Sequence, residues 1–177
     1  MLLDTLCVLG IDPGTRITGW GVIEKRGTTL VHVDNGAIIT RSRDPLIDRL
    51  KVIHDGLMEV IERHGPTVGG IESIFVSRNV SSALKLGHAR GVAMLAAANH
   101  GLELAEFAPQ AVKRAVVGTG RAEKKQVAEM VRMILGLPEI PQEDAADALA
   151  VAIARAHRMN VELPVVSGRR ARSRRRG

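Results

Sequence analysis

The segment CVLGIDPGT, residues 7–15, decides how the rest of the chain is interpreted. A short apolar run ends in a carboxylate, Asp12, and Pro13 and Gly14 then turn the chain. An apolar run bounded by turn residues is typical of a buried strand. Open α/β sheets bind ligands at the carboxyl ends of their strands, where Asp12 would then lie. Because Asp before Pro-Gly is also ordinary turn chemistry, this motif alone leaves both interpretations open.

The remaining pattern alternates between strand and helix periodicity. Strands are expected at 7–12, 17–24, 30–39, 67–72 and 102–108, and the first three form an antiparallel meander. Helical spacing predicts helices over 46–64, 79–100, 109–118, 122–135 and 143–159. The fold class expected from this order is α/β, with a mixed five-stranded sheet and helices on both faces.

The charge of the chain is concentrated at its end. Of the 177 residues, 25 are Lys or Arg and 19 are Asp or Glu, and six of the arginines lie between residues 169 and 176. We expect one domain over 1–160 and a basic, disordered tail over 161–177 that binds nucleic acid or only improves solubility. Nothing in the chain reads as a membrane span or a targeting segment, so a cytoplasmic protein without membrane partners is expected. The single cysteine, Cys7, excludes an internal disulfide and is expected to be a buried apolar residue.

Four carboxylates are candidates for one catalytic metal site. Asp12 and Glu72 each end an apolar strand, and Asp144 and Asp147 share a face at the start of the last helix. Gathered in one crevice they would repel each other unless cations neutralised them. With no paired His or Cys, such oxygen ligands select Mg²⁺ or Mn²⁺, and two ions suit hydrolysis of a phosphodiester. The alternative is that the two aspartates only cap a helix.

Basic residues near the predicted strand ends are candidates for DNA binding. Around the Gly118–Gly120 turn these are Lys113, Arg114, Arg121, Lys124 and Lys125, which bind phosphates or form a solvated helix face. No acidic residue lies between Glu72 and Glu103, where Arg78 and Lys85 are further candidates. Phe75 would wedge against an unstacked base or pack in the core. Gly87 and Gly91 allow close approach of the sheet or of a second copy of the chain.

Four motifs together resemble one family. The segments LGIDPGTRITGWGVI (9–23), IESIFVSRNVSSALKLGHARGVAMLAAA (71–98), VKRAVVGTGRAEKKQV (112–127) and EDAADALAVAIAR (143–155) are similar to the RuvC Holliday junction resolvases. The resemblance runs in order from about Leu6 to His157, and the Arg-rich tail after Leu163 departs from it.

The resemblance implies a ribonuclease-H-like fold, a homodimer, and Mg²⁺-dependent paired nicking of a four-way DNA junction in recombination and repair. It assigns metal binding and catalysis to Asp12, Glu72, Asp144 and Asp147. It also implies supporting roles for Lys113 and Lys124, a base contact for Phe75, and a RuvA–RuvB branch-migration partner. Two other classes stay open at this point. Asp-x-Gly-Thr after a strand also occurs in actin-like ATPases and sugar kinases, and a non-catalytic DNA-binding module would need no carboxylates.

Overall fold

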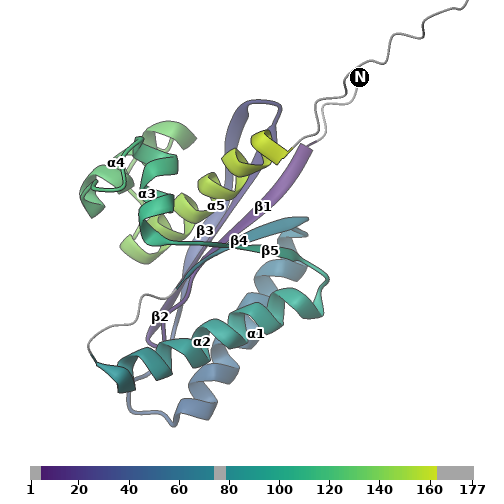
Figure 1. Ribbon diagram of the computed structural model, residues 1–177. Helices are drawn as coiled ribbons and strands as arrows, with labels where there is room; N and C mark the ends of the chain where they lie inside the picture. The colour runs from purple at the N-terminus through teal and green to yellow at the C-terminus, as the bar shows by residue number, and fades with distance from the viewer. Residues whose placement is uncertain (1–4, 74–78, 163–177) are drawn as a thin grey trace, which may run out of the picture.

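A single mixed sheet forms the centre of the computed structural model, which describes residues 5–73 and 79–162 (Figure 1). Its strand order is β3-β2-β1-β4-β5. The antiparallel meander comprises β1 (Thr5–Asp12), β2 (Ile17–Arg26) and β3 (Thr29–Ile39). The other two strands, β4 (Val68–Glu72) and β5 (Glu103–Phe107), run parallel to β1. The predicted mixed five-stranded sheet is confirmed.

Helices cover both faces of the sheet, as the sequence predicts (Figure 1). One layer contains α1 (Leu46–His64) and α2 (Val80–Asn99). The opposite layer contains α3 (Pro109–Val117), α4 (Lys124–Leu135) and α5 (Glu143–Glu162). No helix in the described ranges is long and apolar enough to cross a membrane.

The apolar run of β1 reflects burial on both faces. Val8 belongs to the core under α3, α4 and α5, whereas Leu9 and Ile11 belong to the core under α1 and α2. A strand covered on both faces reads as a continuous apolar run. Trp20 and Phe107 are also buried. Cys7 differs, because it is only partly buried, and its Sγ donates to the carbonyl of His64 at 3.6 Å.

Glycines in β1 and β2 allow α5 to lie directly on the sheet. A Cβ added at Gly10 would lie 2.0 Å from the carbonyl oxygen of Ala148, and one at Gly19 would lie 2.0 Å from that of Asp144. Real side chains cannot be accommodated at such separations, so these positions require glycine. Buried alanines, including Ala145, form the helix side of the contact. This close approach brings the first turn of α5 to the end of β1.

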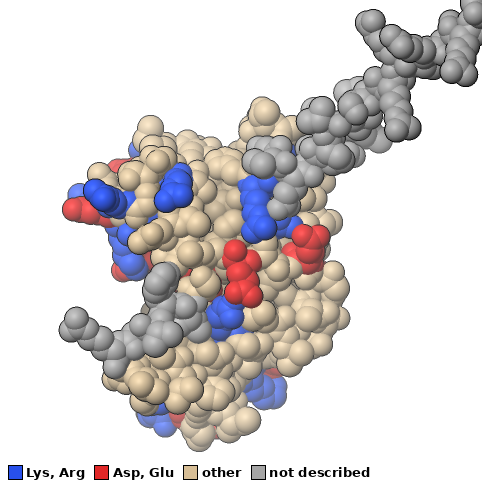
Figure 2. Space-filling view, in the orientation of Figure 1, with Lys and Arg blue, Asp and Glu red and all other residues tan. Residues whose placement is uncertain are grey.

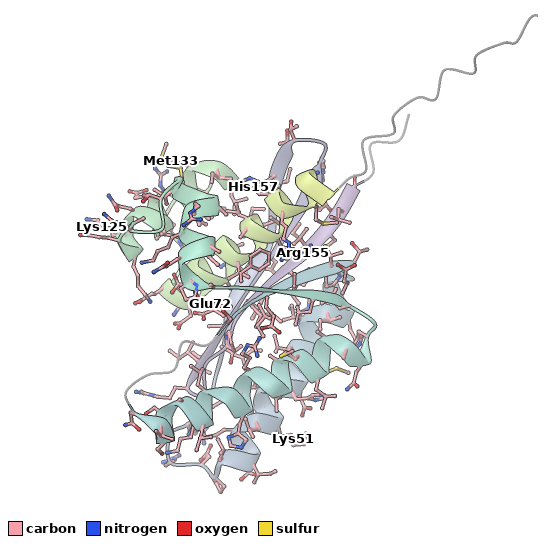
Figure 3. All side chains as sticks on the ribbon, in the orientation of Figure 1. Lys51, Glu72, Lys125, Met133, Arg155 and His157 are labelled. Atoms are coloured by element: carbon pink, nitrogen blue, oxygen red, sulfur yellow. The ribbon has the colours of Figure 1, made fainter. Side chains whose placement is uncertain are left out.

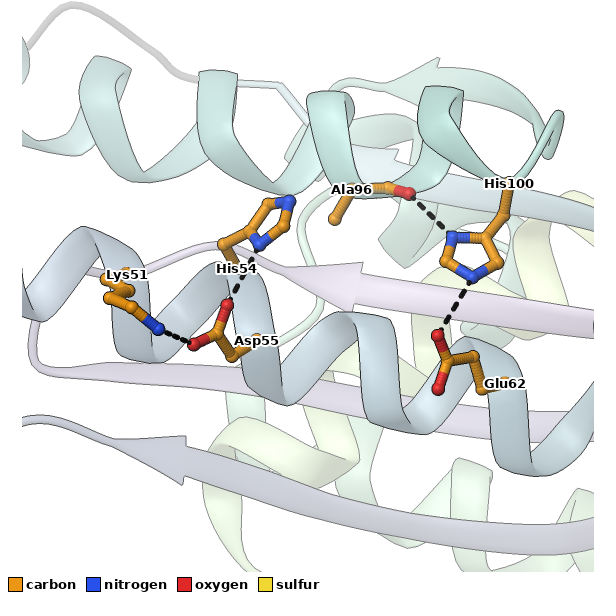
Figure 4. A network of polar contacts seen from close by, with 6 residues as sticks. All are labelled: Lys51, His54, Asp55, Glu62, Ala96 and His100. Carbon is orange, nitrogen blue, oxygen red and sulfur yellow. Dashed lines mark hydrogen bonds and ion pairs between the residues drawn. The ribbon is translucent and has the colours of Figure 1, made fainter.

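Small side chains also dock α2. Its buried residues are alanines, and polar contacts link its C-terminal end to α1 (Figure 4). His100 Nδ1 donates to the carbonyl of Ala96 at 3.4 Å, and its Nε2 lies 3.5 Å from Glu62 Oε1. The other side of α2 presents exposed apolar residues, among them Leu84 and Leu95.

Candidate active site

Asp12 and Glu72 end two neighbouring strands at the same edge of the sheet. The parallel pairing of β1 with β4 matches Ile11 with Ile71, so the two acidic residues follow at equivalent positions. The turn after Asp12 is braced, because Thr18 Oγ1 donates to the carbonyl of Gly14 at 2.8 Å. Glu72 lies at the sheet edge between the two helix layers (Figure 3). Both carboxylates therefore lie at the carboxyl ends of neighbouring strands, where open α/β sheets bind ligands.

A third carboxylate, from α5, joins them in one cleft. Asp147 lines a cleft of about 330 Å³ together with Asp12 and Glu72. Lys113 and Lys124, from α3 and α4, lie on the wall of the same cleft. Its other lining residues are Pro109, Val112, Val127 and Ala150.

Asp144 lies in an adjacent hollow. This hollow is lined also by Gly14, Thr15, Arg16 and Ile17. The Asp144 carboxylate accepts a hydrogen bond from Gln142 Nε2 at 2.5 Å. It is still close enough to Asp12 for its charge to raise the pKa of Asp12. The structure thus brings three of the four predicted carboxylates into one cleft and places the fourth beside it.

Burial of the carboxylates and repulsion between them dominate the electrostatics of the cleft. Burial, followed by repulsion from Glu72 and Asp147, raises the pKa of Asp12 to about 8. Burial and the charge of Asp147 also raise the pKa of Glu72, against the effect of Lys124 and Lys113. Asp12 therefore holds a proton near neutral pH and donates a hydrogen bond to Glu72. Such a site favours a cation.

Lys124 interacts with one of these carboxylates and with a residue that sequence reasoning missed. Its Nζ lies 3.0 Å from Glu143 Oε1 and 3.1 Å from Asp147 Oδ2. The hydrogen bond to Glu143, and then the one to Asp147, raise the pKa of Lys124. The position of Glu143 in the first turn of α5, next to Asp144, was the only signal in the sequence.

No three acidic, His or Cys side chains of the described residues form a group that could hold a metal ion in these positions. Two of the carboxylates are held apart from the others by contacts with neighbouring side chains. Gln142 holds Asp144, and Lys124 holds Asp147. The sequence analysis did not single out Gln142. Its Oε1 accepts a hydrogen bond from the backbone N–H of Ala145 at 3.1 Å and so caps the first turn of α5. The metal-binding role of the four carboxylates stays a prediction.

The other predicted DNA-binding residues are distributed around the cleft. Arg114 and Arg121 share a polar hollow of about 410 Å³ beside it. Lys125 lies on the outer side of α4, away from Glu72 (Figure 3). Lys85 is exposed on α2. Lysines and arginines gather over the α3–α4 region of the surface (Figure 2). Phe75 and Arg78 lie outside the described residues.

The sheet order, the two helix layers and the acidic cleft at the strand ends define the ribonuclease-H-like class of α/β proteins. Within it, the chain belongs to the RuvC family, since the family described as "Crossover junction endodeoxyribonuclease RuvC" matches residues 8–155. The predicted family and fold are therefore confirmed. The division of the chain at residue 160 stays a prediction.

Relatives and solved structures agree with this assignment. The RuvC of Syntrophotalea carbinolica is 65% identical over 150 residues, covering 85% of this chain and 93% of the relative. That of Trichlorobacter lovleyi is 50% identical over 170 residues, covering 94% and 96%. Thermus thermophilus RuvC superposes with a TM-score of 0.81 at 35% identity, covering 89% of this chain and 97% of that one. Its complex with a Holliday junction substrate gives a TM-score of 0.81 at 33% identity, covering 88% and 96%. This agreement favours a nuclease over the ATPase and the non-catalytic module.

Proposed function

We propose that this chain is a metal-dependent endonuclease that resolves four-way DNA junctions by paired, symmetric nicks during recombination and repair. The observation that carries the proposal is the cleft in which Asp12, Glu72 and Asp147 meet, with Lys113 and Lys124 on its wall. Carboxylates can hold cations, and lysines can bind the phosphates on either side of the bond that is cut. The relative in complex with a Holliday junction supports the choice of DNA substrate.

The donor set of the cleft fits Mg²⁺, with Mn²⁺ able to substitute. The acidic side chains of the cleft offer only carboxylate oxygens, and burial with mutual repulsion raises the pKa of Asp12 to about 8, so a bound cation would relieve this repulsion. Asp12, Glu72, Asp144 and Asp147 would hold two ions. When bound, these ions supply the charge that activates water and stabilises the departing 3′ oxygen, leaving 5′-phosphate and 3′-hydroxyl ends.

The lysines and their neighbours would hold the DNA. Lys113 and Lys124 line the cleft, so they are placed to contact the phosphates nearest the cut. Arg114 and Arg121 extend this basic surface along the α3–α4 side. Arg78, Lys85 and Lys125 are assigned to more distant phosphates, and Phe75 to an unstacked base of the junction.

A homodimer would supply two such sites. An apolar groove of about 480 Å³ lies along α2, lined by Leu50, Ala83, Leu84, Gly87, His88, Gly91, Val92 and Leu95. A Cβ added at Gly87 or Gly91 would meet nothing within 4 Å, so the backbone of a second copy can approach there. The surface over α2 is mostly uncharged in Figure 2. Two-fold symmetry would hold two sites at the fixed separation that opposed strands require.

Partners and location follow from the proposed role. The resemblance to RuvC proteins supports action with a RuvA–RuvB branch-migration complex, in the cytoplasm where the chromosome lies. The Arg-rich tail, residues 169–176, would add non-specific affinity for DNA.

The test is a synthetic four-way junction incubated with the full chain and Mg²⁺. We expect nicks at symmetric positions in two opposed strands, none on linear duplex of the same sequence, and none in EDTA. Mn²⁺ should restore activity after EDTA treatment, and Ca²⁺ should not. Equal cutting of linear duplex, or cutting that persists in EDTA, would contradict the proposal. Hydrolysis of ATP without any nicking would instead favour the actin-like class.

A further inference from the structure

Arg90 connects the middle of α2 to the ends of two strands of the sheet. Its side chain is largely buried, with 17% exposed. Its Nε donates to the backbone carbonyl of Glu72 at 3.3 Å, and its Nη2 forms an ion pair with Glu106 Oε2 on β5. One guanidinium therefore holds the last residue of β4 and a residue of β5 at the same time.

The contact is made where β4 stops. The pairing of β1 with β4 ends at Ile11 and Ile71, one residue before Glu72. On the other side, Glu72 pairs with Phe107, and the N–H of Ser73 donates to the Phe107 carbonyl at 2.8 Å. The sheet thus fixes this end of β4 mainly from the β5 side, and Arg90 adds a hold on the Glu72 carbonyl from α2. Orientation of the Glu72 peptide sets the direction in which its side chain leaves the strand.

Docking of α2 does not require a buried arginine. The helix packs through Ala89, Ala93, Ala96 and Ala97, which are buried. Burying a guanidinium is costly unless its donors are satisfied, so apolar packing would dock the helix at lower cost. The planar fork of arginine can donate to a carbonyl through Nε while a terminal nitrogen pairs with a carboxylate. Lysine carries its three donors on one nitrogen, so it cannot place two separate nitrogens against the carbonyl and the carboxylate in this fixed geometry.

We propose that Arg90 is a positioning residue, which fixes the catalytic carboxylate of Glu72 by holding the backbone carbonyl of the same residue. The inference rests on the proposed function, in which Glu72 binds metal. Catalytic groups lose efficiency when they are displaced by about 1 Å, and the groups that orient metal ligands tune metal affinity. Glu106 in turn fixes the guanidinium.

The experiment compares three variants by single-turnover junction cleavage, junction affinity in Ca²⁺, and calorimetric titration with Mg²⁺ in the absence of DNA. Arg90→Lys keeps the charge opposite Glu106 but removes the Nε donor. Glu106→Gln removes the ion pair and leaves the Nε contact in place. Arg63→Lys is the matched control, because Arg63 pairs with Glu59 on the surface of α1. All assays are made well below the lowest melting temperature of the set.

For Arg90→Lys we expect cleavage to fall roughly 10- to 100-fold and Mg²⁺ affinity to fall about tenfold, with junction affinity within about twofold. Glu106→Gln should lose much less of both, and Arg63→Lys nothing. Wild-type cleavage and Mg²⁺ affinity in Arg90→Lys would overturn the proposal. So would losses that follow melting temperature equally in Arg90→Lys and Glu106→Gln, because these would show a purely structural role. Absence of nicking by the unaltered chain would instead refute the proposed function, while the Mg²⁺ titration would still decide the role of Arg90.

Discussion

The carboxyl groups of Asp12 and Glu72 share a hydrogen bond at the ends of two neighbouring parallel strands. Two ionised acids in this position would repel each other, so Asp12 keeps its proton near neutral pH when no cation is present. Folding therefore brings together carboxylates whose proximity is unfavourable when they are ionised, and a bound cation would offset their repulsion. This conflict between stability and site geometry supports the proposal that the cleft is a functional site.

The protonation of Asp12 predicts an unusual dependence of stability on pH. Its pKa is raised in the folded protein from an ordinary 3.8 to about 8, so between these values the folded state binds more protons than the unfolded state. The stabilisation is present at low pH and is lost as pH rises through about 8. Melting temperature in EDTA should therefore fall from pH 5 to pH 8.5, by about 2–4 °C for each 1 kcal/mol lost.

Asp12→Asn is the control for this dependence, because the amide cannot ionise. The variant should show a flatter curve and should melt above the unaltered chain at pH 8.5. Parallel curves for the two proteins would show that the Asp12 pKa is not raised. Mg²⁺ added at pH 8.5 should raise the melting temperature of the unaltered chain more than that of Asp12→Asn, because a ligand of the folded state stabilises it.

Lys124 and Lys125 offer a matched pair for testing the basic wall of the cleft. Both side chains are exposed, but Lys124 lines the cleft and contacts Asp147, whereas Lys125 is not among the residues that line this cleft. We expect Lys124→Ala to reduce the single-turnover rate of junction cleavage at least about tenfold, since a positive group near the reacting phosphate is lost. Lys125→Ala should change the rate by less than about threefold. Equal losses in the two variants would indicate a general charge effect.

The packing of α5 on β2 can be tested with one methyl group. A Cβ at Gly19 would lie 2.0 Å from the Asp144 carbonyl, so Gly19→Ala must displace the first turn of α5. We expect a loss of about 3 kcal/mol in the free energy of unfolding, at the upper end of overpacking effects. Cleavage should fall further than stability explains, because Asp144 and Asp147 move with that turn. Denaturant unfolding and single-turnover cleavage measure the two effects, and a variant as stable and active as the original would contradict this packing.

The basic tail predicts a change in salt dependence. Residues 169–176 carry six arginines, and each phosphate contact releases counterions when DNA binds. Deleting this segment should weaken duplex binding and lower the slope of log affinity against log salt by several units. Fluorescence anisotropy between about 50 and 200 mM salt measures the slope. An unchanged slope would make the tail incidental to DNA binding.

Periodicity predicted the elements of this fold well, because its strands and helices are regular and bounded by Gly or Pro. The convergence of Asp12 and Glu72 was predictable, since both end apolar strands and parallel strands share an edge. These features depend on local sequence and on general rules of sheet topology.

Contacts between side chains of different elements were not predictable. The pair formed by Lys124 and Glu143 joins α4 to α5, and the pair formed by Arg90 and Glu106 joins α2 to β5. Which of several exposed charges meet depends on how the helices lie on the sheet, which no local pattern encodes. Asp144 was predicted to share one cleft with the other three carboxylates, but it lies in the adjacent hollow, because its position also depends on how α5 lies on the sheet. Cys7 is only partly buried because it lies near the start of β1.

The central claim is that the carboxylate cleft nicks the junction, and the Asp12→Asn variant tests it most directly. Single-turnover cleavage of a synthetic four-way junction in Mg²⁺ is measured beside junction affinity in Ca²⁺. We predict that cleavage by Asp12→Asn falls at least about a thousandfold, while its junction affinity stays within about threefold. Paired nicking at the rate of the unaltered chain would contradict the account and place the active site elsewhere in the molecule.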